Sequence, residues 1–245
     1  MAVATFTFVP ALTFVAAFFG WLALILRCVV VCRLIAGVNF AGVAAVRRIV
    51  RVAPQLGIGT LTLYAFSSDN WERPAAEVTS LLALLEDYLR ADASECAARG
   101  VRLRVIGRRD RLPRSLVEAI ESAERQTSAG RAIDLRIALD YSSRDAILRA
   151  SCWMLSSLEV SGREFARRLG QVTNSGGAVP DVDLLIRTGG EQRLSDFMLW
   201  ESAYAELHFT PRMWPEFDVA DLEVAVEDYF GRERRFGRLP DAAAS

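Results

Sequence analysis

The sequence predicts a single α/β domain in which a central, mostly parallel sheet is flanked by helices. From Gly42 onward, short β-rich runs alternate with amphipathic helical segments. Strands separated by single helices become parallel neighbours through right-handed crossovers. A length of 245 residues is ordinary for one such domain, and 52% hydrophobic residues supply an ample core. No internal repeat or low-complexity tract suggests a different architecture.

The first half of this pattern gives two helices and two strands. A helix over 44–53 is closed by Gly57, and a β-rich run over 61–66 ends in polar residues. A long amphipathic helix over 77–98 ends before Gly100, and 101–106 alternates as a strand. One face of the long helix is apolar; it consists of Val78, Leu81, Leu82, Leu84, Leu85, Tyr88 and Leu89.

The second half continues the alternation. The pattern predicts a helix over 113–126, a strand over 133–139, a helix from about 143 and a shorter helix over 164–169. A loop rich in Gly, Asn and Ser over 173–177 precedes a strand over 183–186, and the last helix spans 218–234. Residues 238–245 form a short tail, so the folded domain is expected over 42–237.

Composition excludes several classes of function. The formal net charge of −1 argues against a protein that binds nucleic acid through a general basic field. His208 is the single histidine, which rules out multi-histidine metal sites and makes a Ser-His-Asp triad improbable. The four cysteines lack the paired spacing of a zinc site or a disulfide framework. This cysteine usage suits a reducing cytoplasm.

The N-terminal segment, 1–41, differs from the rest of the chain. Residues 5–26 form an uncharged, mostly apolar run that is long enough to span a bilayer, and Arg27 and Arg33 follow it. The competing interpretation is a buried first strand, at about 13–19, with a covering helix, because buried parallel strands also read as continuous apolar runs. Both interpretations stay open, so a cytoplasmic protein is expected with membrane association as an alternative.

Two polar clusters follow predicted strands directly. The first begins at Ser67, and the second runs from Arg187 through Gly189, Gly190 and Arg193. Ligands of parallel α/β sheets bind beyond the carboxyl ends of the strands. Glycines let the backbone approach a ligand closely, and arginine forks match phosphate oxygens. The second cluster is therefore a candidate diphosphate clamp, with surface arginines in ion pairs as the alternative.

Three stretches carry a resemblance to a known family. They are Tyr-Ala-Phe-Ser-Ser-Asp-Asn-Trp-Glu-Arg-Pro from Tyr64, Ile-Arg-Thr-Gly-Gly-Glu-Gln-Arg-Leu-Ser-Asp-Phe from Ile186, and Trp-Glu-Ser-Ala-Tyr-Ala-Glu from Trp200. Together they resemble the undecaprenyl diphosphate synthases, the cis-prenyltransferase family of isoprenyl transferases. The resemblance runs from about Gly42 to Gly237. It implies a homodimeric α/β enzyme that condenses isopentenyl diphosphate with an allylic diphosphate, such as farnesyl diphosphate, and forms a cis double bond with Mg²⁺ as cofactor.

The resemblance also implies roles for single residues. Asn70 is the implied catalytic residue, which helps to remove the proton. Glu206 is the implied Mg²⁺ ligand, although on sequence alone it is equally a solvated residue. The implied substrate-binding residues are Ser67, Ser68, Asp69, Trp71 and Arg73 around the allylic substrate, and Arg187, Arg193, Leu194 and Ser195 around isopentenyl diphosphate. Part of the apolar face of the 77–98 helix is expected to form core, and part to line a product tunnel.

One departure from the family pattern lies near the N-terminus. The family opens with a strand that runs into Asp-Gly-Asn, whose Asp anchors Mg²⁺ and a diphosphate, and nothing here matches it. Counting back from Ala41 places the Asp position near Leu22, and the first acidic residue of the chain is Asp69. Three interpretations follow: a wrong start or frame error before an ordinary enzyme, a membrane-anchored non-catalytic partner subunit, or an active enzyme with another metal ligand. Trans-type prenyl synthases are excluded, since no Asp-Asp-x-x-Asp motif occurs.

Overall fold

A computed structural model describes residues 26–31, 39–155 and 160–233. Six strands form one sheet in the order β3-β4-β2-β1-β5-β6, and every neighbouring pair is parallel. The expected parallel α/β fold is confirmed. The strands are β1 (Leu26–Val31), β2 (Ile58–Ser67), β3 (Val101–Ile106), β4 (Ile133–Tyr141), β5 (Leu184–Arg187) and β6 (Glu206–Phe209).

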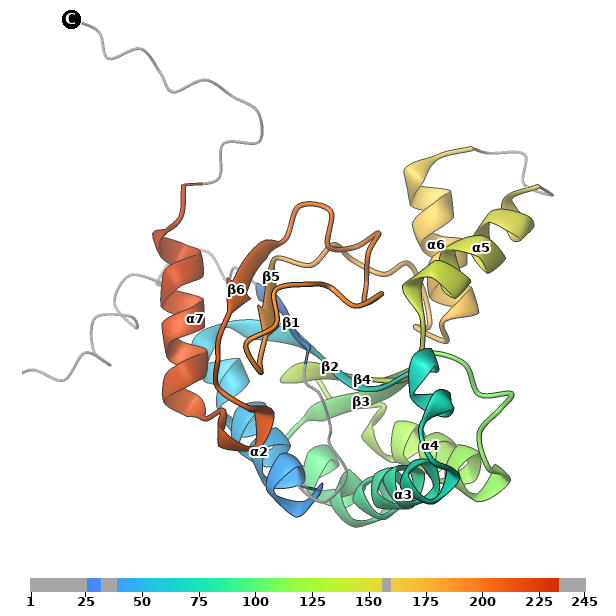
Figure 1. The fold of residues 1–245 in the computed structure, drawn as a ribbon, viewed down its shortest axis with the longest axis horizontal. Coiled ribbons are helices and arrows are strands. Elements are labelled where there is room, and N and C mark those ends of the chain that lie inside the picture. The colour runs from blue at the N-terminus through green and yellow to red at the C-terminus, as the bar shows by residue number, and fades with distance from the viewer. Residues whose placement is uncertain (1–25, 32–38, 156–159, 234–245) are drawn as a thin grey trace, which may run out of the picture.

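Helices follow the strands in the chain (Figure 1). Most of them lie within a few residues of the expected positions, because the helical period and the glycines that end helices are local signals. They are α2 (Asn39–Val52), α3 (Ala75–Ala98), α4 (Arg114–Thr127), α5 (Ser143–Met154), α6 (Gly162–Val172) and α7 (Val219–Gly231), with short 3-10 turns η1 (Ala53–Leu56), η2 (Ser68–Glu72) and η3 (Trp214–Glu216).

Strand β1 lies in the middle of the sheet, between β2 and β5. Its Cys28 and Val30 enter the main core, whereas Val29 enters a second core on the other face. The sequence pattern did not locate β1, because Arg27 interrupts its apolar residues and the strand directly follows the longer uncharged run. The folded unit therefore reaches N-terminal to residue 42, at least to Leu26. The strand expected at 13–19 lies outside the described residues.

The main core fills the face of the sheet that α2, α3, α4 and α7 cover (Figure 1). On α3, six of the seven residues in the expected apolar stripe are buried, and Leu84 is half-buried. The interpretation of this stripe as core is thus confirmed for most of its length, while a tunnel wall stays a prediction. Helices α5 and α6 form a separate hairpin with its own small cluster around Ala150 and Leu169.

The membrane anchor expected at 5–26 falls almost wholly outside the part of the chain that the structure describes; its last residue, Leu26, belongs to β1. Among the described helices, none combines the length and the apolar character that crossing a bilayer requires. The short strand β6 is the other element that the sequence pattern missed, because four residues of mixed polarity, Glu-Leu-His-Phe, carry no periodic signal.

Candidate active site

The carboxyl edge of the sheet brings the two polar clusters to the same side of the molecule. Ser67 is the last residue of β2 and Arg187 the last residue of β5, and only β1 separates these strands. Two strand spacings correspond to about 10 Å across the sheet. In register, Arg187 pairs with Val31 and Ser67 pairs with Tyr141. The expected site at this edge thus has its two halves on nearby strands.

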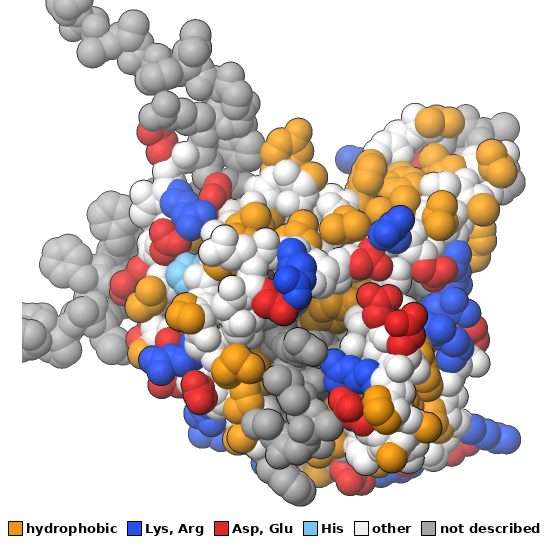
Figure 2. Space-filling view, viewed as in Figure 1, with side chains coloured by type: hydrophobic (Ala, Val, Ile, Leu, Met, Phe, Trp, Pro, Cys, Tyr) orange, Lys and Arg blue, Asp and Glu red, His pale blue; other side chains and the backbone are white. Residues whose placement is uncertain are grey.

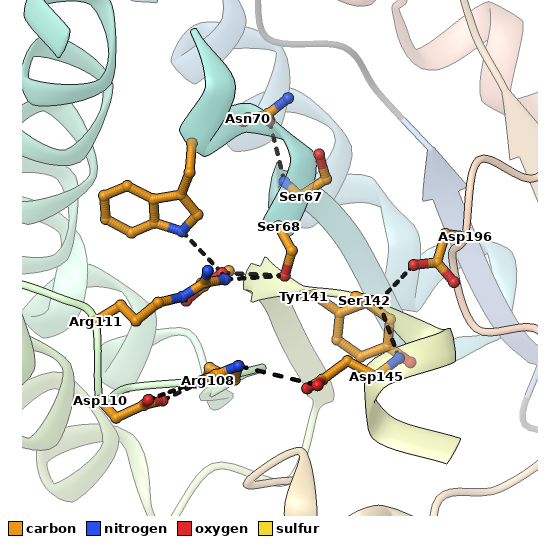
Figure 3. A network of polar contacts seen from close by, with 12 residues as sticks. Ser67, Ser68, Asn70, Arg108, Asp110, Arg111, Tyr141, Ser142, Asp145 and Asp196 are labelled. Atoms are coloured by element: carbon orange, nitrogen blue, oxygen red, sulfur yellow. Dashed lines mark hydrogen bonds and ion pairs between the residues drawn. The ribbon is translucent and has the colours of Figure 1, made fainter. Parts of the chain in front are cut away.

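The first half is the loop 67–73, which turns through η2. The side-chain oxygen of Asn70 accepts a hydrogen bond from the backbone N–H of Ser67 at 3.0 Å (Figure 3). This bond closes the turn and leaves the Asn70 NH₂ group as the donor that a ligand can use. Asp69 is exposed, and Arg73 reaches Glu77 at 2.8 Å.

Asp140 completes this half, although the sequence pattern assigned it no role. Its side chain is fully buried and accepts hydrogen bonds from the indole N–H of Trp71 at 2.9 Å and from the Ser68 hydroxyl at 3.1 Å. Arg111 makes a forked ion pair with the same carboxylate. Asp140 lies next to the carboxyl end of β4, so the rule that singled out Ser67 and Arg187 also applied to it.

The second half is the loop 187–195. Gly189 and Gly190 have φ values of +87° and +77°, in the left-handed region that glycine adopts without strain. Their backbone N–H groups donate to the carbonyls of Arg212 and Thr210, respectively. Ser195, with φ +49°, is exposed at the end of the loop, and Leu194 packs against the second core. Backbone hydrogen bonds therefore hold the glycine turn, while Arg193 and Ser195 are exposed.

Glu191 forms ion pairs with both arginines of this loop. Its carboxylate pairs with Arg187, which is buried, and with Arg193 at 2.5 Å. Bonding to the Arg187 guanidinium, and less strongly the charge of Arg193, holds the pKa of Glu191 below its usual range. A carboxylate thus rests in the cationic fork of the loop. The arrangement is suited to binding an anion, and sequence reasoning had not singled out Glu191.

Both halves are fixed to the junction of β4 and α5. Asp140 holds the loop 67–73, and two residues later the Ser142 hydroxyl donates to Asp196 at 2.5 Å (Figure 3). The backbone N–H of Arg144 also donates to the Asp196 carboxylate, at 2.8 Å. Because Asp196 directly follows Ser195, this junction sets the position of the second loop as well as the first.

Glu206 does not join this group within one chain. It begins β6 and pairs in register with Leu184, the first residue of β5, whereas Arg187 ends that strand. Three residues of a strand cover about 10 Å, so Glu206 lies towards the amino edge of the sheet. Its carboxylate binds Arg232 at 2.9 Å. In residues 26–31, 39–155 and 160–233, no group of three or more His, Cys, Asp or Glu side chains is placed to hold a metal ion.

Glu201, which follows the second loop in the chain, is a buried acid. Only 1% of the residue is exposed, and its Oε2 has no hydrogen-bond partner among the residues that the structure describes. Burial raises the pKa of its carboxyl group to about 7, while Arg136 opposes the rise and Asp181 adds to it. Its backbone carbonyl accepts from the N–H of Val182 at 2.8 Å. The side chain is therefore mostly protonated in the folded protein below pH 7.

We expect Glu201→Gln to flatten the pH dependence of stability. The unfolded chain ionises Glu201 near 4.5, whereas the folded chain keeps the proton to about 7. The free energy of unfolding therefore falls as pH rises between these values, by on the order of 3 kcal/mol, and then stays low. Urea unfolding at pH 5 and pH 8 measures the difference. The exposed control Glu118→Gln should follow the wild type; a Glu201→Gln curve parallel to wild type would contradict the assignment.

Comparisons with known proteins give one consistent result. A family described as putative undecaprenyl diphosphate synthase matches residues 36–237. Isoprenyl transferase 1 of Bradyrhizobium diazoefficiens is 55% identical over 199 residues, which cover 81% of this chain and 79% of the relative. The isoprenyl transferase of Aquifex aeolicus is 42% identical over 203 residues, covering 83% and 87%.

Two solved structures share the fold. The lavandulyl diphosphate synthase of Lavandula x intermedia, solved in complex with dimethylallyl diphosphate, gives a TM-score of 0.80 at 31% identity and covers 86% of this chain and 98% of its own. A probable undecaprenyl diphosphate synthase from Campylobacter jejuni gives 0.76 at 30% identity, with 87% and 99% covered.

Proposed function

The chain belongs to the undecaprenyl diphosphate synthase family of isoprenyl transferases, and we propose that it condenses isopentenyl diphosphate with an allylic diphosphate such as farnesyl diphosphate. One observation of the structure supports this proposal most directly. The loop with the arginine fork and the loop with Asn70 lie at the same edge of the sheet, fixed to one junction. An enzyme that joins two diphosphates needs both sites within reach of each other.

In the proposed reaction, the C4 atom of isopentenyl diphosphate attacks C1 of the allylic substrate, whose diphosphate leaves. A proton is then lost from C2, and the new double bond is cis. The guanidinium groups of Arg187 and Arg193 and the Ser195 hydroxyl hold the isopentenyl diphosphate, and the diphosphate displaces Glu191 from the fork. Ser67, Ser68, Asp69, Trp71 and Arg73 surround the allylic substrate.

Asn70 contributes to proton removal without being a base itself. A neutral amide accepts no proton at ordinary pH, but its NH₂ group can donate to the diphosphate or water oxygen that takes the proton. The bond from Ser67 N–H to the Asn70 oxygen holds the amide in one orientation, so this donor has a fixed direction. Positioning of this kind lowers the barrier without a new charged group.

Mg²⁺ is proposed as the cofactor. Mg²⁺ keeps several waters and commonly binds through one or two carboxylates together with substrate phosphates. The described residues of one chain do not place Glu206 beside Arg187, and they form no three-carboxylate cluster. The residues present therefore do not make a complete protein site, and we propose that Mg²⁺ enters with the diphosphates, whose charge it neutralises. Glu206 as a ligand stays a prediction.

The direct test is turnover by the purified chain. Radiolabelled isopentenyl diphosphate and farnesyl diphosphate with Mg²⁺ should give a butanol-extractable polyprenyl product, and excess EDTA should abolish it. Turnover would exclude a purely accessory subunit. Absence of product from a folded chain that still binds farnesyl thiodiphosphate, an inert allylic analogue, would instead favour the partner-subunit alternative. Translation of the upstream DNA in all frames then tests for a displaced Asp-Gly-Asn segment.

We also propose that the chain forms a homodimer. Figure 2 shows hydrophobic side chains gathered on the α5–α6 hairpin, at the upper right of the view. Leu148 is 68% exposed and Leu155 and Val160 are each 89% exposed, and Trp200 lies against Phe165 of α6. An exposed apolar patch of this kind marks an interaction surface. Light scattering in solution tests the proposal: a mass of one chain, 27.1 kDa, would contradict it.

A further inference from the structure

We propose that Asp140 is the positioning residue of the active site: its buried carboxylate fixes the turn Ser68–Glu72 and thereby sets the direction of Asn70. The inference rests on the proposed transferase function and adds to it a residue that touches no substrate. No carboxylate of the site is more deeply buried, and three side chains from two other loops converge on it.

Several hydrogen bonds from neighbouring loops end on the Asp140 carboxylate. Oδ1 accepts from Ser68 at 3.1 Å and from Trp71 at 2.9 Å, and Oδ2 accepts from Arg111 at 2.9 Å. A second nitrogen of Arg111 also reaches Oδ1. A buried carboxylate is stable only when it is paired and hydrogen-bonded, and here every bond also restrains the loop 67–73 or the loop after β3.

Trp71 is the side chain through which the carboxylate acts on the turn. Its indole N–H is bound to Asp140, the Arg111 guanidinium lies 5.5 Å from its ring centre, and Phe66 packs edge-on at 5.4 Å. A ring held at its edge and on its face has one position. Trp71 follows Asn70 directly in the chain, so a shift of the indole moves the backbone that carries the catalytic amide.

The backbone at Asp140 explains which residues fit there. Its φ is +50°, in the left-handed region that Asp, Asn and Gly enter most readily. Its carbonyl also accepts from the N–H of Arg108 at 3.1 Å. Asn keeps this backbone and an oxygen for Trp71 and Ser68, whereas Gly keeps the backbone and removes the oxygen. The pair Asp140→Asn and Asp140→Gly therefore separates the bond to the turn from backbone strain.

The experiment measures kinetics and stability for both variants. Asp140→Gly should lower kcat by roughly 10- to 100-fold and raise the KM for farnesyl diphosphate, with the KM for isopentenyl diphosphate unchanged, because a small misplacement of a reacting group costs this much. Asp140→Asn should keep kcat within about threefold of wild type. Both variants lose the ion pair with Arg111, so both should show a lower Tm. Activity and stability then diverge in Asp140→Asn, which a merely structural role does not predict.

Two further variants serve as an independent check and as a control. Trp71→Phe removes the same hydrogen bond from the other end and should reproduce the kinetic pattern of Asp140→Gly, even where Asp140→Gly folds poorly. Asp110→Asn changes a carboxylate of the neighbouring loop that is 61% exposed and pairs with Arg108, and should leave all parameters unchanged. Equal loss of activity in Asp140→Asn and Asp140→Gly, or loss in neither, would overturn the positioning role.

An NMR measurement that needs no enzymatic turnover tests the role of Asp140 independently of the proposed function. The indole N–H resonance of Trp71, assigned by comparison with Trp71→Phe, should move in Asp140→Gly and stay near its wild-type position in Asp140→Asn. If the wild-type chain shows no turnover but the resonance moves only in Asp140→Gly, the transferase proposal is refuted and the anchoring of the turn by Asp140 is supported. Wild-type turnover with an unmoved resonance and unchanged kinetics in Asp140→Gly would refute the positioning role alone.

Discussion

Replacing Arg193 by Ala is expected to raise the KM for isopentenyl diphosphate roughly 10- to 150-fold and to change the KM for farnesyl diphosphate little. A charge-assisted hydrogen bond contributes about 1.5–3 kcal/mol, which corresponds to this range. The Arg193 side chain is 62% exposed, and within the described part of the chain its ion pair is with Glu191. Its removal should therefore weaken the diphosphate clamp and leave the fold intact. Steady-state kinetics with each substrate varied in turn gives both constants.

Two controls make this result specific. Arg193→Lys keeps the positive charge and loses the planar fork, so its KM for isopentenyl diphosphate should fall between wild type and Ala. Arg125→Ala removes a guanidinium of α4 that is 71% exposed and lies outside the site, and should match wild type. Equal increases in both KM values for Arg193→Ala would show that the loop 187–195 does not bind isopentenyl diphosphate selectively.

The sheet and its helices were largely predictable because their signals are local. The strand at 101–106 has the expected bounds, and α4 differs from its expected range by one residue at each end. Strand β1 was not located, because Arg27 lies within it and no periodic pattern separates it from the uncharged run that precedes it. The strand is defined by its pairing with β2 and β5, and pairing is a long-range property.

The candidate site was predictable to a different degree. Ser67 ends β2 and Arg187 ends β5, two strands that only β1 separates, and the structure places both at the carboxyl edge of the sheet. Asp140 and Glu191 both lie at or just after predicted strand ends, but sequence spacing does not reveal their contacts. Asp140 accepts a hydrogen bond from Trp71, and Glu191 pairs with Arg187 and Arg193. Glu206 was predicted to join the site, but it lies opposite Leu184, at the other end of β5 from Arg187.

Replacing Asn70 by Ala is expected to lower kcat by roughly 100-fold or more, with much smaller changes in both KM values. The expected size follows from the contribution of a positioned group that assists proton transfer, typically 10²- to 10⁴-fold. The reason for the kcat effect is that the NH₂ donor acts while the proton leaves, not while substrates bind. Rapid-quench measurement of the first condensation distinguishes this chemical step from product release.

The difficulty is that Asn70 also closes the turn, since its oxygen accepts from Ser67 N–H at 3.0 Å. Asn70→Asp separates the two roles, because a carboxylate keeps the acceptor for Ser67 and lacks the NH₂ donor. If Asn70 acts only by closing the turn, Asn70→Asp restores activity and the catalytic role is wrong. If the donor is needed, Asn70→Asp stays as slow as Asn70→Ala while its Tm returns towards wild type. Gln126→Ala, which removes an exposed amide of α4, should leave kcat unchanged and so shows that loss of an arbitrary amide is harmless.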